Sequence, residues 1–185
     1  VLGTSIDTSF AAWHLFFANA AIKRKIDNYA FIRCDLHIKV LINASPFYYS
    51  ALMVSWNPLT GFYSTTAPMV NSLVPLSQRP NIVIYPQKSS GGEMVLPFLY
   101  PREWLDLTST VDLQQMGRLH LDSFDVLRSA NSNSGTSVDI QVFAWAENVE
   151  LSGLTVDLAV QGSMDGPISK PASAVARATG LLSKI

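Results

Sequence analysis

Alternation of apolar and polar residues within Phe31–Ile42, unbroken from Ile32 to Val40, is the feature that most restricts how this chain can fold. One face of an extended segment there carries only apolar side chains: Ile32, Cys34, Leu36, Ile38, Val40 and Ile42. The opposite face carries polar or charged side chains: Arg33, Asp35, His37 and Lys39. Because successive side chains of a strand point to opposite faces, this pattern predicts a long strand with one face buried.

Further strands follow at short intervals. The turn Asn43-Ala44-Ser45-Pro46 ends the first strand, since Pro has no amide hydrogen to donate and Asn and Ser favour turns. A second strand, Ala51–Trp56, stops before Pro58. The other candidates are Asn81–Tyr85, Glu93–Leu99, Trp104–Thr108, Arg118–Leu127 and Ser137–Val149. Several short strands with turn residues between them favour a β-sandwich or a barrel.

The residues before the first strand predict an arm followed by a short amphipathic helix. The predicted helix has aromatic and small residues at helical spacings: Trp13, Phe16, Phe17 and Ala20. An irregular lid is the alternative for this segment. Farther along, Thr60–Ser77 is rich in Thr, Ser, Pro and Gly and has no sustained period, which predicts a long loop of the kind that carries contacts.

The composition fits one domain, or one domain with arms, in 185 residues. Only 15% of the residues are charged, against about a quarter in an ordinary soluble domain. Either Ser, Thr and Asn supply the surface, or neighbouring subunits cover part of it, and the composition fits both explanations. The net charge of −1 provides no broad attraction to nucleic acid, so any RNA contact is local, disordered or supplied by another chain.

No segment predicts a membrane span or a signal peptide. The apolar stretch Phe10–Ile22 is interrupted by His14 and Asn19, and it is shorter than the roughly 18 to 20 residues that cross a bilayer. No basic region precedes the first apolar residues. The chain begins at Val1 without Met, which suggests a cleaved or trimmed chain, and a polyprotein product would fit.

Residues that usually carry catalysis are few and scattered. The histidines are His14, His37 and His120, and no G-x-S-x-G elbow presents a nucleophilic serine. His37 and His120 stand beside charged residues on alternating strands, so we expect both to face solvent. Cys34 is the single cysteine, and its aliphatic neighbours predict a buried, unreactive thiol. We therefore expect no enzymatic activity, no catalytic residues, no cofactor and no metal site.

Four segments of the chain have distinctive sequences, and they follow one another in a distinctive order. They are Tyr29–Leu59 with its Trp-Asn-Pro ending, Ser77–Pro86 (SQRPNIVIYP), Gly92–Leu107 (GEMVLPFLYPREWLDL) and Val142–Gly153 (VFAWAENVELSG). Together they resemble the jelly-roll coat proteins of picornavirus-like viruses over roughly Ala21 to Gly153. The resemblance implies an all-β fold: an eight-stranded antiparallel jelly-roll sandwich with an N-terminal arm, a short helix and a C-terminal extension. In that roll Tyr29–Ala44 would be the first strand and Ser137–Val149 the last.

The resemblance implies a structural capsid subunit of a non-enveloped icosahedral positive-strand RNA virus. Its partners would be other viral coat proteins, and its location would be the virion and, during assembly, the host cytoplasm. No host receptor is predicted. A jelly-roll carbohydrate-binding or cell-surface ligand domain is the alternative, since it would also be rich in strands and poor in charge. A cupin-like enzyme would need a His-x-His metal pair, which the sequence lacks.

Three regions are expected along the chain: an arm with a short helix over 1–28, a jelly-roll domain over 29–160 and a tail over 161–185. The tail sequence GPISKPASAVARATGLLSKI resembles the segment near the end of the first-encoded major coat protein of dicistroviruses and marnaviruses. Its basic residues Lys170, Arg177 and Lys184 are expected to face RNA or a neighbouring coat protein, with a flexible end as the alternative. The short N-terminus departs from that family, in which a longer extension is expected.

The strand alternation also predicts which side chains fill the space between two sheets, since the residues of one face must share the core. These are Ile32, Leu36, Ile38, Val40, Val54, Leu96, Leu119, Leu121, Ile140 and Val142.

Overall fold

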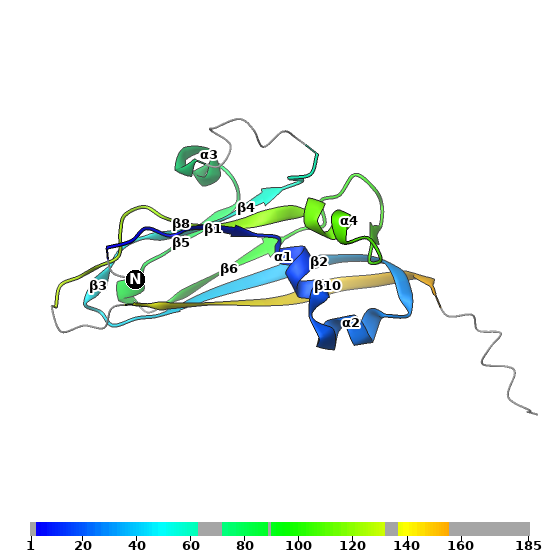
Figure 1. The fold of residues 1–185 in the computed structure, drawn as a ribbon, viewed down its shortest axis with the longest axis horizontal. Coiled ribbons are helices and arrows are strands. Elements are labelled where there is room, and N and C mark those ends of the chain that lie inside the picture. Colours follow the sequence, from blue (N-terminus) through cyan, green and yellow to red (C-terminus); the bar gives the residue numbers. More distant parts are fainter. Residues whose placement is uncertain (1–2, 63–71, 89, 132–136, 156–185) are drawn as a thin grey trace, which may run out of the picture. The chain divides into compact units, whose positions relative to one another are not determined.

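Two antiparallel sheets face each other across a shared hydrophobic core (Figure 1). The computed structural model describes residues 3–62, 72–88, 90–131 and 137–155. In spatial order, the first sheet consists of β1 (Asp7–Phe10), β8 (Gly117–Ser123), β4 (Leu52–Pro58) and β5 (Asn81–Ile84). The second consists of β10 (Asp139–Leu154), β2 (Tyr29–Asn43) and β6 (Gly91–Leu96), with β7 (Leu105–Asp106) also paired to β2. A separate small pair joins β3 (Tyr48–Tyr49) to β9 (Arg128–Ser129).

Short helices connect the strands in the described residues: α1 (Ala12–Ala18), α2 (Ala20–Ile26), α3 (Leu73–Ser77), α4 (Thr110–Gln115) and the 3-10 turn η1 (Pro86–Lys88). Asn19 separates α1 from α2, and its side-chain oxygen accepts a hydrogen bond from the amide of Ala21 at 2.9 Å. This N-cap lets the second helix start in a new direction. Among the described helices, none is long and apolar enough to cross a membrane.

β2 is the strand that the alternation predicts. Its apolar residues Ile32, Cys34, Leu36, Ile38, Val40 and Ile42 are all buried. Its neighbour on one side is β6, where Leu36 lies opposite Leu96 and Lys39 opposite Glu93. The Lys39 ammonium donates to Glu93 Oε1 at 2.6 Å on the outer face. The alternation therefore determines which face of β2 is buried, and the register places the apolar residues of β6 on the same face of the sheet.

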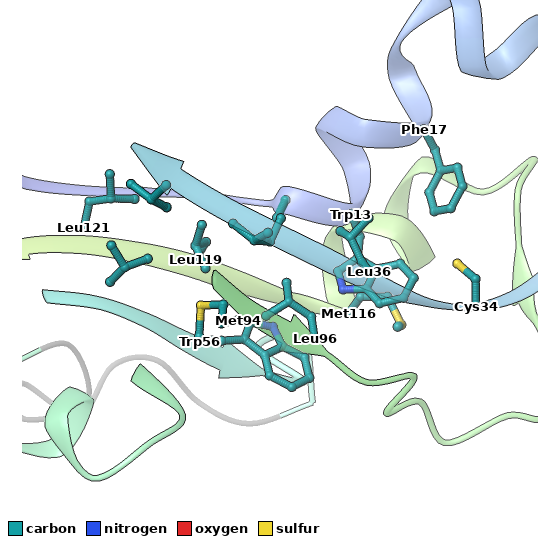
Figure 2. Packing of buried hydrophobic residues seen from close by; sticks show 14 of the residues in the cluster. Trp13, Phe17, Cys34, Leu36, Trp56, Met94, Leu96, Met116, Leu119 and Leu121 are labelled. Atoms are coloured by element: carbon teal, nitrogen blue, oxygen red, sulfur yellow. The ribbon is translucent and has the colours of Figure 1, made fainter. Parts of the chain in front are cut away.

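Aromatic residues of α1 close one end of the core. Trp13 is completely buried and Phe17 nearly so, and their ring centroids lie 6.2 Å apart. Figure 2 shows Trp13 near Leu36 of β2 and Met116, with Leu119 and Leu121 farther along between the sheets. The expected helix forms over Trp13, Phe16 and Phe17, and its apolar side packs on the core, but it ends at Ala18 and Ala20 belongs to the separate helix α2.

The described structure confirms most of the predicted core. Ile32, Leu36, Ile38, Val40, Val54, Leu96, Leu119 and Leu121 are buried between the sheets. Ile140 is only partly buried, although it packs against the core. The prediction is wrong for Val142, whose side chain is 38% exposed. Both belong to β10, an edge strand in the described residues, and Val142 lines a cleft there.

A strand precedes β2, which the sequence did not predict. Asp7–Phe10, expected to lie in an arm, forms β1 and pairs antiparallel with β8, with Phe10 opposite Leu119. Tyr29–Asn43 is therefore not the first strand of the sandwich. A four-residue strand with one large apolar side chain is too short to show a period, so only its pairing with β8 reveals it.

We predict that Leu36→Ala lowers the free energy of unfolding by about 2 to 5 kcal/mol, because it removes a completely buried side chain and leaves a cavity. Ile140→Ala should cost less, since Ile140 is already partly exposed. Val95→Ala is the matched control, because Val95 lies on the neighbouring strand β6 and is 48% exposed. Urea unfolding of the three variants measures this order, and equal midpoints for Leu36→Ala and Val95→Ala would contradict it.

Candidate interaction surfaces

The long edge strand β10 carries an uncovered apolar surface. It runs for sixteen residues and has β2 as its hydrogen-bonded neighbour in the described structure. Apolar side chains are exposed on it, with Val142 at 38%, Phe143 at 49% and Val149 at 47%. An edge strand presents unpaired amides and carbonyls, and a soluble monomer usually protects such a row with charges, Pro or a covering loop. The exposed Val and Phe side chains beside this unpaired row make β10 a candidate interaction surface.

A mainly apolar cleft opens beside the same strand. Its volume is about 400 Å³, and its lining comes from β1, α1, α2, β2 and β10: Phe10, Ala12, Leu15, Phe16, Asn19, Ile22, Ile38, Val142 and Ala144. Ile38 is a core residue, so Val142 and Ala144 of β10 are on the inner face of the sandwich where the cleft leaves them open. Inner-face residues that reach solvent form an apolar surface suited to contact with another segment.

The outer face of the second sheet, in contrast, is polar and internally paired. The Asp35 carboxylate of β2 accepts hydrogen bonds from the side-chain amide of Asn148 at 2.9 Å and from the backbone amide of Phe98 at 3.0 Å. The hydrogen bond from Asn148, followed by that from Phe98, lowers the pKa of the Asp35 carboxyl. These contacts fix β10 and the segment after β6 to the central strand.

His37 continues this polar face. Its ring stacks on Trp145 with centroids 5.3 Å apart, and its Nε2 lies 3.4 Å from Glu147 Oε2. The indole of Trp145 donates to the other carboxylate oxygen of Glu147 at 2.9 Å. His37 therefore faces outward as predicted, but a ring and a carboxylate of β10 hold it in place.

His120 does not face solvent, and that prediction is wrong. It lies on the outer face of the first sheet with an exposure of only 4%, and its neighbour Ser55 on β4 is completely buried. The chain covers this face: α3 packs on β4 and buries Leu76 completely. Burial lowers the pKa of His120, and the charges of Arg118 and Arg79 lower it further, so the ring stays neutral.

The remaining predicted site residues separate into two groups. Lys170, Arg177 and Lys184 of the tail lie outside the described residues. Cys34 is buried as predicted, and its surroundings raise the pKa of the thiol to about 12, chiefly by desolvation. Within residues 3–62, 72–88, 90–131 and 137–155, no three His, Cys, Asp or Glu side chains gather in a way that could hold a metal ion.

Two facing antiparallel sheets around one hydrophobic core define the class of this fold as an antiparallel β-sandwich. No family model matches the chain. It is 30% identical over 131 residues to the structural polyprotein of acute bee paralysis virus, a match over 69% of this chain and 14% of that polyprotein.

Solved structures of virus particles also contain chains similar to this one. The chain is 38% identical to a chain in the structure of a marine algae virus of the order Picornavirales, with a TM-score of 0.74 over 84% of this chain and 68% of that one. It superposes on a chain of the full particle of Israeli acute paralysis virus with a TM-score of 0.72, over 81% of this chain and 61% of that one. The identity there is 23%, which shows a shared fold alone.

The chain belongs to the jelly-roll capsid proteins of the Picornavirales. The jelly-roll fold predicted from the sequence is confirmed, while the number of eight strands stays a prediction. These relatives favour a capsid protein over the carbohydrate-binding alternative. The chain spans only 14% of the bee virus polyprotein, so what the whole polyprotein does is not transferred to it.

Proposed function

We propose that this chain is a structural subunit that assembles with other coat proteins into an icosahedral shell. The observation that carries the proposal is the edge of β10 with its cleft, in a chain that belongs to a capsid family. Apolar side chains on an inner sheet face need a cover, and in a shell protein that cover is further coat-protein polypeptide.

The physical work of such a subunit is association. A segment that adds to the edge of β10 would satisfy its unpaired backbone groups and bury Val142 together with the cleft. Each contact between subunits needs little affinity of its own, because closure of a symmetric shell makes every contact depend on many others. The low charge content fits the second explanation offered by the composition, in which neighbours cover part of the surface.

The finer parts of the proposal follow from the same role. The subunit is located in the virion after assembly in the host cytoplasm, and it has no enzymatic activity. The burial of His120 and the high pKa of the Cys34 thiol support this, since a buried ring does not reach a substrate and a protonated thiol is a poor nucleophile. The predicted boundary of the jelly-roll domain at residue 29 is too late, since β1 at Asp7–Phe10 already pairs with β8; its end at 160 and the tail that follows stay proposals.

The tail is proposed to lie on the inner surface of the shell, where it contacts RNA or a neighbouring coat protein. Lys170, Arg177 and Lys184 can approach phosphate, although three positive charges give only a weak, salt-dependent attraction. The sequence resemblance of this segment to the end of a first-encoded coat protein supports the assignment to that position in the precursor.

We predict that Val142→Arg lowers the yield of particles by about tenfold or more while the chain still folds, because the cover of the cleft would bury an unpaired charge. The variant is introduced into the virus's complete coat-protein precursor, and particles are counted after sedimentation. Val83→Arg is the matched control, since Val83 is 40% exposed on β5 of the other sheet. Equal yields for Val142→Arg and the unsubstituted precursor would contradict the role of the cleft.

For the tail, we expect slow tryptic cleavage at Arg177 in intact particles and fast cleavage in disassembled subunits. A tail on the inner surface is shielded by the shell, whereas a free chain end is cut readily. Mass spectrometry of the fragments over time measures both rates. Cleavage at the same rate in both samples would place the tail outside the shell and reject this part of the proposal.

A further inference from the structure

Two carboxyl groups face each other where the edge strand β1 joins the first sheet. Asp7 of β1 lies directly opposite Asp122 of β8 in the antiparallel register. Asp122 is buried, with an exposure of 6%, and its Oδ2 atom has no hydrogen-bond partner. Asp7 is exposed, and like charges directly opposite on neighbouring strands are destabilising, so the pairing is tighter when one of the two groups is neutral.

Burial raises the pKa of Asp122 to about 6, and the charge of Asp7 and a hydrogen bond to it raise it as well. Below that pH the Asp122 carboxyl keeps its proton and donates it to Asp7. Above it, a buried carboxylate stands opposite a second one.

No cation among the described neighbours compensates that charge. On β4 the residue opposite Asp122 is Met53, which is apolar and completely buried. On β8 itself, the nearest residue on the same face is His120, kept neutral by burial and by Arg118 and Arg79. The Arg118 guanidinium donates to the carbonyl and the hydroxyl of Ser9, at 2.9 and 3.2 Å, and so holds the other end of β1.

We propose that Asp7 and Asp122 form a proton-dependent latch that fastens β1 to β8 when they share a proton and loosens it when the proton is lost. β1 is the part that moves, because it is a four-residue edge strand and β8 lies inside the sheet. Movement of β1 would separate Asp7 from Asp122 and allow water to reach Asp122. The strand continues into α1, and Phe10 and Ala12 line the cleft beside β10, so the latch controls one wall of that cleft.

The direction of the pH dependence follows from linkage. A carboxyl whose pKa is raised in the folded state adds stability that is complete below its ordinary value of 3.8 and is lost as the pH rises through about 6. The latch is therefore closed in acid and loosened at neutral pH. The pKa of Asp122 differs between its ordinary value of 3.8 and about 6 in the folded chain, and this difference limits the change in the equilibrium between paired and loosened β1 to about a hundredfold.

Amide hydrogen exchange of the full chain, followed residue by residue by NMR, tests the latch. After correction for the chemical exchange rate, the opening equilibrium of the β1 amides should rise by about tenfold or more between about pH 5 and about pH 7.5. The amides of β2 at Leu36–Val40 serve as the internal reference for global unfolding, and their protection should change much less. Equal β1 protection at the two pH values would overturn the proposal.

Asp122→Asn should keep β1 protected at both pH values, because the amide is similar in shape and does not ionise. Asp7→Asn should reduce the pH response, and it provides a second variant if the first does not fold. Asp125→Asn is the matched control, since its side chain is 63% exposed near the end of β8, and it should respond to pH as the unsubstituted chain does. An unchanged response in Asp122→Asn would assign the effect to another group and reject the latch.

Discussion

Burial of the apolar face of β2 is the interaction on which the rest of this molecule depends. β2 is the middle strand of its sheet, with β10 on one side and β6 and β7 on the other. Its inner residues contribute a continuous apolar row to the core, and each buried aliphatic side chain contributes roughly 1.5 to 3 kcal/mol. Removing this row would leave the neighbouring strands and the aromatic residues of α1 without a surface to pack on.

The sequence predicts this central layer well because the relevant forces are local. In β2 the period alone separates the buried face from the polar one, and β5 and β6 follow from similar short patterns. The same reasoning fails for Val142 in β10. Period identifies the face of a strand, but the exposure of a residue depends on which segments, distant in sequence, pack over that face.

Tertiary contacts also explain the other differences. His120 occupies an outer-face position by period, yet α3 and its flanking residues cover that face. The helix α4 was not predicted, although Ser109 caps it by accepting a hydrogen bond from the Asp112 amide at 3.2 Å, a signal that was available in the sequence. The edge position of β10 among the described strands could not be read from sequence at all, since it arises from sheet order. By contrast, the family resemblance correctly identified a capsid protein before any contact was known.

The environment of Cys34 has a practical consequence for chemical labelling. It is the only sulfhydryl in the 185 residues, and thiol reagents require the ionised form, which is scarce when the pKa is about 12. Maleimide probes should thus not react with the native chain. A single cysteine introduced at a chosen surface position can then be labelled selectively with a fluorophore or a gold particle. Modification of Cys34 itself would then report loss of the core, so the same reagent serves as a marker of particle damage.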